Sequence, residues 1–245
     1  MCERYVARNT GSVAYALQIP ELEQTIETDP ARGVEGSYRI VSRVHGGGVY
    51  TVEPGDSVVF SLVIEALAKD DAEVAASADD MWAERKAFLD AVDDNLVLDT
   101  PDDVIDTEFR YAKIRASESI FKTKRGYMHG PGGESYYAAI WANDQAEYVN
   151  PFFPFLGYGV GNESALNAYR LFAQYMNDEY KPIPSSIIAE GDGTWSGAGD
   201  RGDAAMIAYG AARYALTRGD RAEAEELWPL IEWCLEYCKR QINDE

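Results

Sequence analysis

The spacing of hydrophobic and polar positions changes once along the chain, from the alternation of strands to the three- and four-residue spacing of helices. Up to residue 67, β-branched and aromatic runs are separated by Gly, Pro, Asn and Asp, which favour turns. Strands are expected at 4–9, 13–19, 37–44, 48–52 and 57–65. The last run is apolar on both faces, which is typical of a strand between two layers. The pattern predicts a β-sandwich domain over residues 1–67, thin enough to be partial.

After residue 67 the apolar residues recur at the three- and four-residue spacing of helices. Residues 68–99 are rich in Ala, Asp, Glu and Lys, and Ser77 followed by Asp79 and Asp80 is a helix start signal, so a helical linker is expected. Residues 100–245 are expected to form a helical domain. Its helices are expected to begin near Thr100, Asn143, Asn162, Ala204 and Asp220. The predicted fold is therefore a multidomain α+β protein.

Composition and charge limit the kinds of ligand and site that we expect. The chain has 245 residues and carries 22 Lys and Arg against 42 Asp and Glu, a formal net charge of −20. Such a charge repels nucleic acids and anionic membranes and suits a neutral or cationic small ligand. Two histidines and three cysteines leave little material for a metal site, a histidine-based triad or a disulfide framework. We expect no metal and no cofactor.

The sequence contains no targeting signal that we can interpret. No apolar run approaches the roughly 20 residues that a membrane-spanning helix needs, and residues 1–11 lack the basic and apolar segments of a signal peptide. We therefore expect no membrane association and predict no compartment.

Candidate chemistry concentrates in two loops that precede helices. The first, residues 129–158, combines a Gly-Pro stretch with aromatic rings and carboxylates, which together can stack on a sugar and bind its hydroxyls. Its candidate ligand residues are Glu134, Tyr136, Tyr137, Trp141, Asn143, Asp144 and Glu147. The second loop, residues 189–203, has Trp195 at its middle. Its candidates are Asp192, Trp195, Asp200, Arg201 and Asp203.

Each candidate residue also has a purely structural interpretation. Asp200 and Asp203 precede a helix and could be N-caps, and any of these carboxylates could pair with Arg201. About half of such aromatic side chains would belong to the core rather than to a ligand site.

A β-sandwich, a helical linker and helices preceded by Gly, Trp and acid-rich loops resemble the six-hairpin (α/α)6-barrel glycosidases, which include glucoamylases, trehalases, processing glucosidases and α-L-rhamnosidases. The segment Ile140-Trp141-Ala142-Asn143-Asp144 looks like the Trp-x-x-Asp motif at the second barrel helix, and residues 191–203 look like the loop before the fourth. The resemblance implies that Asp144 and its preceding residue bind sugar hydroxyls. That residue is often Arg in the superfamily and is Asn143 here, so the substrate is expected to differ.

The resemblance implies a glycoside hydrolase that acts on an oligosaccharide or glycoside. One carboxyl group protonates the leaving oxygen, and a second activates water or attacks the anomeric carbon. A carboxyl group that stays protonated near neutral pH lies near aromatic rings or other acids. Asp144 beside Trp141 and Asp200 beside Trp195 fit that environment best and are the predicted catalytic residues.

The helical part is shorter than a complete barrel of this type, which needs on the order of 200 to 250 residues. We therefore expect residues 100–245 to form the first part of the barrel, with the base outside it, so that the chain alone is weakly active or inactive. Another chain, including a second copy by self-association, would have to complete the ring. The alternatives are a carbohydrate-binding protein without catalysis and a helical-repeat scaffold, although no fixed repeat period is present.

Overall fold

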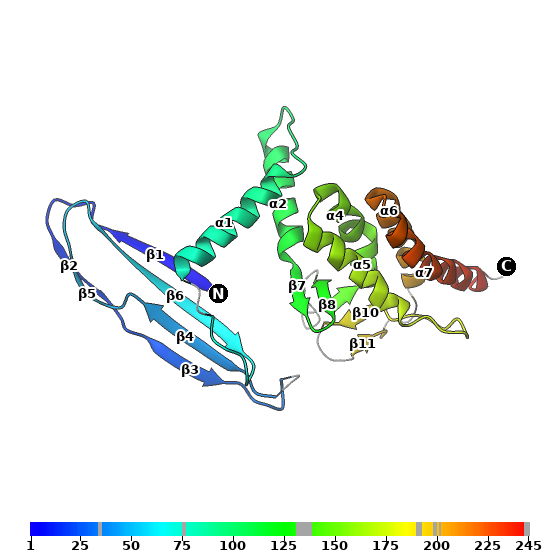
Figure 1. Cartoon of the computed structure of the whole chain (residues 1–245), viewed down its shortest axis with the longest axis horizontal. Helices are drawn as coiled ribbons and strands as arrows, with labels where there is room; N and C mark the ends of the chain where they lie inside the picture. Colours follow the sequence, from blue (N-terminus) through cyan, green and yellow to red (C-terminus); the bar gives the residue numbers. More distant parts are fainter. Residues whose placement is uncertain are drawn as a thin grey trace. The chain divides into compact units, whose positions relative to one another are not determined.

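The computed structural model describes residues 1–33, 36–74, 77–130, 139–189, 193–197, 200 and 202–242. The protein is a mixed α/β structure with several small sheets (Figure 1). Its internal contacts divide it into two compact units, Met1–Phe88 and Leu89–Glu245. The division falls inside the segment 68–99 that was expected to be a linker, within helix α1 (Ala78–Asp94).

The first unit consists of antiparallel strands. One sheet has the order β1-β6-β4-β3, and β2 pairs with β5 in a second sheet. The bounds are β1 (Cys2–Arg8), β2 (Tyr15–Ile19), β3 (Glu23–Glu27), β4 (Arg39–His45), β5 (Gly48–Val52) and β6 (Ser57–Leu67). Five of these strands lie where the alternation predicts them. The sequence of β3, EQTIE, has no apolar face, and pairing with β4 at Thr25 and Val41 makes it a strand.

Asn9 links the two sheets of this unit. It follows β1, and its buried side-chain amide donates to the carbonyl oxygens of Val52 at 2.9 Å and Val13 at 2.8 Å. The expectation that β6 is covered on both faces was wrong for part of the strand, because Val59 is 45 % exposed. Few apolar side chains are buried here, so backbone pairing contributes much of the order of the first unit.

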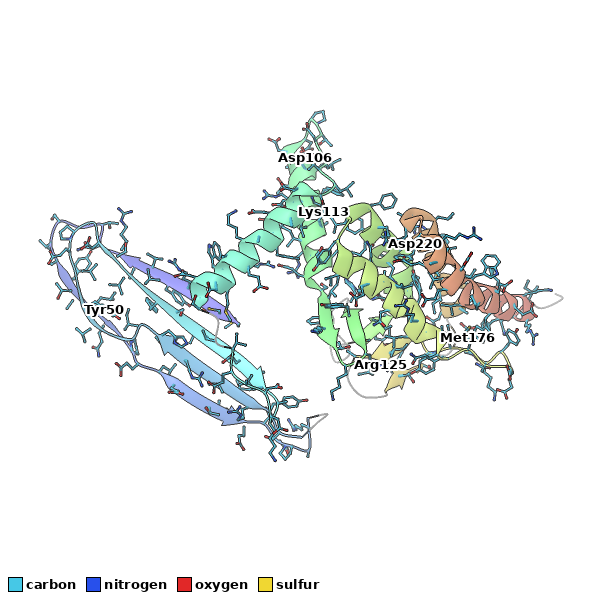
Figure 2. All side chains as sticks on the ribbon, in the orientation of Figure 1. Tyr50, Asp106, Lys113, Arg125, Met176 and Asp220 are labelled. Carbon is cyan, nitrogen blue, oxygen red and sulfur yellow. The ribbon has the colours of Figure 1, made fainter. Side chains whose placement is uncertain are left out.

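Lys113 anchors the end of α1 within the second unit. Its ammonium group donates to the carbonyl oxygens of Val92 (2.9 Å), Asp93 (3.0 Å) and Asn95 (2.6 Å). Those carbonyls lack helical partners because α1 ends there. Lys113 lies on helix α2 (Asp103–Glu118) and is labelled in Figure 2. Burial lowers the pKa of this ammonium group.

Three of the expected helix starts shift by a few residues. Asp102, rather than Thr100, caps α2 by accepting a hydrogen bond from the amide of Val104. The helix expected from Asn162 begins at Gly159, because Tyr158 is extended and its carbonyl accepts from the amide of Asn162. The helix expected near Ala204 begins at Asp203.

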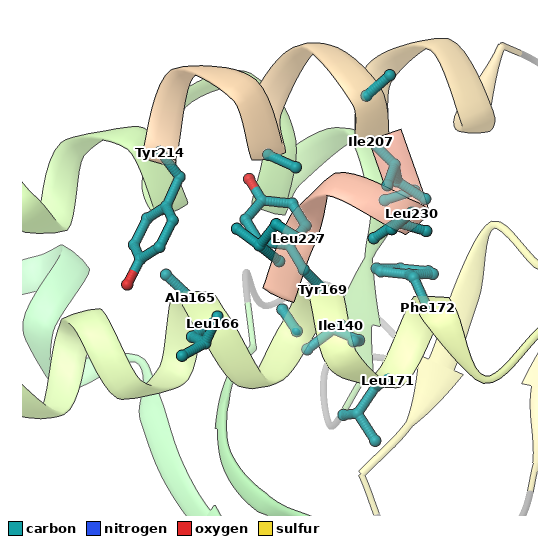
Figure 3. Packing of buried hydrophobic residues seen from close by; sticks show 14 of the residues in the cluster. Ile140, Ala165, Leu166, Tyr169, Leu171, Phe172, Ile207, Tyr214, Leu227 and Leu230 are labelled. Carbon is teal, nitrogen blue, oxygen red and sulfur yellow. The ribbon is translucent and has the colours of Figure 1, made fainter. Parts of the chain in front are cut away.

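The core of the second unit lies among its helices. Figure 3 shows Tyr214, Phe172 and Leu227 within this cluster, all at most 2 % exposed. The helices are α4 (Asn150–Leu156), α5 (Gly159–Ala173), α6 (Asp203–Arg218) and α7 (Arg221–Arg240). Gly210 of α6 lies so close to Ala146 that a Cβ atom there would come within 2.5 Å of the alanine Cβ. The close approach requires glycine at this crossing.

Short strands that the sequence pattern does not predict complete this unit. Strands β7 and β8 form a hairpin, and β9, β10 and β11 form a sheet in the order β11-β10-β9. Their bounds are β7 (Ile120–Thr123), β8 (Gly126–His129), β9 (Ala139–Trp141), β10 (Ser186–Ile188) and β11 (Thr194–Trp195). The small sheet pairs β9 with β10 and β11, which lie more than 40 residues later in the chain. None of the helices in the described part of the chain combines the length and the apolar character that crossing a bilayer requires.

Candidate functional site

Strand β9 delivers the Trp-x-x-Asp segment to the site. Trp141 pairs with Ser186 of β10, and the amide of Ala142 donates to the carbonyl oxygen of Ser185 at 2.9 Å. The backbone then turns into helix α3 (Ala142–Asp144). Asp144 therefore stands in the first turn of a helix whose entry is held by the sheet.

A π-helix continues directly from Asp144. Residues Gln145–Val149 form this segment, η2, which leads into α4. Pro151 has no amide hydrogen and cannot donate to the carbonyl of Glu147 four residues earlier. Arg213 of α6 donates to that carbonyl instead, at 2.8 Å. Helical segments of this kind often occur at functional sites, and here the π-helix adjoins the candidate carboxylate.

The second loop reaches the same place through β11. Trp195 pairs with Ser186 of β10, and its ring lies 5.3 Å from the ring of Trp141, between centroids. Gly202, with φ of +89°, precedes α6 and allows the chain to turn into Asp203. The first and second loops thus meet on one small sheet.

The two loops enclose a pocket of about 310 Å³. Among the described residues its lining consists of Trp141, Asn143, Asp144, Ser185, Asp203 and Met206. Asp203 is 7 % exposed, and its carboxylate accepts a hydrogen bond of 2.6 Å from the hydroxyl of Ser185. The carboxylate of Asp144 accepts one of 2.7 Å from the hydroxyl of Tyr148. The pocket therefore presents two oriented carboxylates and an indole ring.

Four residues predicted from the sequence line this pocket: Trp141, Asn143, Asp144 and Asp203. Trp195 contacts the pocket wall through Trp141. The carboxylate of Glu147 accepts a 3.3 Å hydrogen bond from the side-chain amide of Asn143 and so contacts a lining residue without being among the described lining residues itself.

Asp200, a predicted catalytic residue, contacts helix α7. Its carboxylate accepts hydrogen bonds from the amide of Gly202 at 2.8 Å and from the hydroxyl of Tyr237 on α7. It is not among the described residues that line the pocket. The remaining predicted ligand residues lie outside the described residues: Glu134, Tyr136, Tyr137, Asp192 and Arg201.

Sequence reasoning missed three residues at the pocket. Ser185 belongs to a Pro-rich connection, and only its pairing beside β9 places it there. Met206 lies one turn into α6. Tyr148 lies four residues after Asp144 on a continuous helix, and that spacing was a usable signal.

Loss of hydration shifts the pKa values of two side chains near Asp144, those of Tyr148 and His129. Partial loss of hydration, and then the hydrogen bond to Asp144, raises the pKa of Tyr148 to about 12, so its hydroxyl stays a donor. His129 is buried, and loss of hydration lowers its pKa to about 4 although the charge of Asp144 opposes this change. The side-chain amide of Gln145 donates to the carbonyl of His129 at 2.8 Å. His129 is therefore a neutral imidazole at neutral pH, and it contacts Gln145, the residue that follows Asp144.

Metal chemistry has no evident ligand set in the described ranges, where no group of three or more His, Cys, Asp or Glu side chains is arranged to hold an ion. The chemistry that the pocket itself offers is hydrogen bonding and proton transfer by carboxylates beside an aromatic ring. The chain matches no family model, no curated protein and no solved structure.

Proposed function

We propose that this chain binds a carbohydrate in the pocket between Asp144 and Asp203 and forms part of a glycoside hydrolase. The observation that carries the proposal is the convergence of Trp141, Asp144 and Asp203, from two separate loops, on one pocket of about 310 Å³. An aromatic wall with carboxylate and amide groups suits a ring of hydroxyls better than it suits an apolar or anionic ligand.

The roles of the carboxylates follow from their surroundings and from the resemblance to six-hairpin glycosidases. Asp144 and Asn143 bind sugar hydroxyls at the entry of helix α3. Asp203, held by Ser185, takes the place that the sequence pattern assigned to Asp200 and exchanges a proton with the glycosidic oxygen. Asp200 is assigned to the contact with Tyr237.

The finer architecture belongs to the same proposal. The first unit corresponds to part of a β-sandwich, and the hairpins α4–α5 and α6–α7 of the second unit correspond to part of an (α/α)6 toroid. In such a toroid the water-activating base comes from later helices. We therefore expect the chain itself to bind sugar, with hydrolysis slow or absent until a complementing chain supplies the base.

The test is direct binding by calorimetry to a panel of neutral oligosaccharides, followed by product analysis. Asp144→Asn and Asp203→Asn should each weaken binding about tenfold or more, because a charge-assisted hydrogen bond contributes about 1.5–3 kcal/mol. Asp94→Asn makes the same chemical change at an exposed position of α1 and is the matched control. Thermal unfolding of each variant separates loss of binding from loss of folding.

Each outcome has a defined meaning. Binding of the whole panel that is unaffected by Asp144→Asn and by Asp203→Asn would refute the pocket as the sugar site. Binding that depends on both residues, without product even after a complementing chain is added, would favour the carbohydrate-binding alternative over hydrolysis.

A further inference from the structure

Helix α7 has two apolar faces, of which the core covers one. Leu227, Leu230 and Cys234 are at most 2 % exposed and pack in the core cluster. Trp228 and Leu235 are 55 % and 56 % exposed. They are seven residues apart and therefore lie on one side of the helix, outside the core.

The exposed face of α7 borders a groove of about 860 Å³. Its other wall is the segment after α5, where Met176 and Tyr180 lie; Met176 is labelled in Figure 2. That wall is held rigidly. The ring of Tyr180 stacks on Trp233 at 5.4 Å between centroids, and the Trp233 indole donates to the carbonyl of Asn177 at 3.0 Å. The groove is therefore formed before any ligand arrives.

The stacking in this wall argues against a sugar as the occupant. One side of the Tyr180 ring meets Trp233, and the guanidinium of Arg240 lies 3.7 Å from its centroid. Trp233 also stacks on Tyr237, at 5.6 Å between centroids. Ring faces that already pack against one another cannot stack on a pyranose.

The charge around the groove is negative. Asp178, Glu232 and Glu236 line it, with Lys239 as the cation of the described lining. Glu236 pairs with Arg240 at 2.8 Å, and the chain as a whole has a net charge of −20. A second copy of the chain would bring like charges together at this face and be repelled. A basic partner would be attracted to the acidic side chains.

We propose that this groove binds an amphipathic α-helix of a partner polypeptide, with apolar residues at seven-residue spacing and lysine or arginine beside them. Trp228 and Leu235 pack against the apolar stripe of that helix, and Asp178 and Glu232 attract its basic flank. The spacing along α7 matches helix-on-helix packing, in which seven-residue repeats form the contact. This inference is independent of the sugar site.

The probe is a synthetic helical peptide of about 18 residues made of leucine and lysine in a seven-residue pattern, long enough to be helical in water. A second peptide has glutamate in place of every lysine. Calorimetry measures affinity and stoichiometry for the intact chain and its variants. Leu235→Gln leaves the net charge unchanged and should weaken binding of the lysine peptide about tenfold, as expected for placing a polar amide at one central apolar contact.

Leu216→Gln is the matched control, because Leu216 is 83 % exposed on α6 and does not line the groove. We expect one lysine peptide per chain, no effect of Leu216→Gln and no binding of the glutamate peptide. Equal affinity in the two variants would overturn the proposal and indicate unspecific charge attraction. A protein dimer that Leu235→Gln dissociates, or an oligosaccharide whose binding Leu235→Gln abolishes, would overturn it in favour of that other occupant.

Discussion

Arg213 donates a hydrogen bond of 2.8 Å to the carbonyl oxygen of Glu147, which lies four residues before Pro151, a residue without an amide hydrogen. One side chain of α6 thereby binds the backbone of the π-helix that follows Asp144. The contact joins the helix carrying one pocket carboxylate to the helix that begins with the other, Asp203.

Replacing Arg213 should destabilise the second unit. Arg213→Met keeps the aliphatic stem and removes the donor, and we expect a loss of about 0.5–1.5 kcal/mol, typical of one net hydrogen bond. Urea unfolding followed by tryptophan fluorescence measures the change. Arg221→Met on α7, where the arginine pairs with Glu225 on the surface, is the control and should change stability by less than about 0.5 kcal/mol. Equal effects of the two variants would contradict the role of Arg213.

A methyl group at position 210 should be harmful. Gly210→Ala places a Cβ within 2.5 Å of the Cβ and carbonyl oxygen of Ala146, so α6 must shift. Overpacking of this kind costs about 1–3 kcal/mol. Gly159→Ala is the matched control, because a Cβ there meets no atom within 4 Å. We expect it to be neutral or slightly stabilising, and a similar loss in both variants would show that the helix crossing does not require glycine.

The buried Lys113 should be hard to replace. Lys113→Met fills a similar volume and leaves three carbonyl oxygens at the end of α1 without their donor. We expect a loss of about 2 kcal/mol or more, since buried acceptors become unpaired. Chemical denaturation measures it against Lys122→Met, an exposed lysine of β7. A change within 0.5 kcal/mol of that control, roughly the scatter of surface substitutions, would contradict the capping role.

His129 should make the protein sensitive to mild acid. Its pKa is lowered from 6.5 in the unfolded chain to about 4 in the fold, so the unfolded state binds the proton first. Stability should therefore decrease as the pH falls from about 6.5 towards 4, by up to about 3 kcal/mol for this group. Urea unfolding at several pH values tests this. His129→Gln should flatten the profile between pH 6.5 and 5, whereas His45→Gln, at an exposed position in the first unit, should not.

Salt should stabilise this chain. A net charge of −20 produces self-repulsion in the compact state, and the screening length falls from about 10 Å at 0.1 M to about 3 Å at 1 M ionic strength. The melting temperature should rise over that range of potassium chloride. A melting temperature that is constant or falls would show that surface ion pairs, such as Arg170 with Glu226 at 2.5 Å, outweigh the repulsion.

Local sequence was informative wherever an element forms from its own pattern. The alternation and turn residues of the first unit predicted five of its strands, and apolar spacing with Gly219 as terminator predicted the α6–α7 hairpin. The cluster Trp141, Asn143 and Asp144 was also visible, because its members are neighbours in the chain and their chemistry does not depend on distant residues.

Tertiary structure alone decided the elements and contacts that join distant segments. The strand β3 and the small sheet β9–β10–β11 exist through pairing, and three residues are too few to show an alternating pattern. Tertiary structure also decides that Asp203 lines the pocket and contacts Ser185, whereas Asp200, three residues earlier, contacts Tyr237. Sequence determined which side chains were available, and long-range packing decided which of them face one pocket.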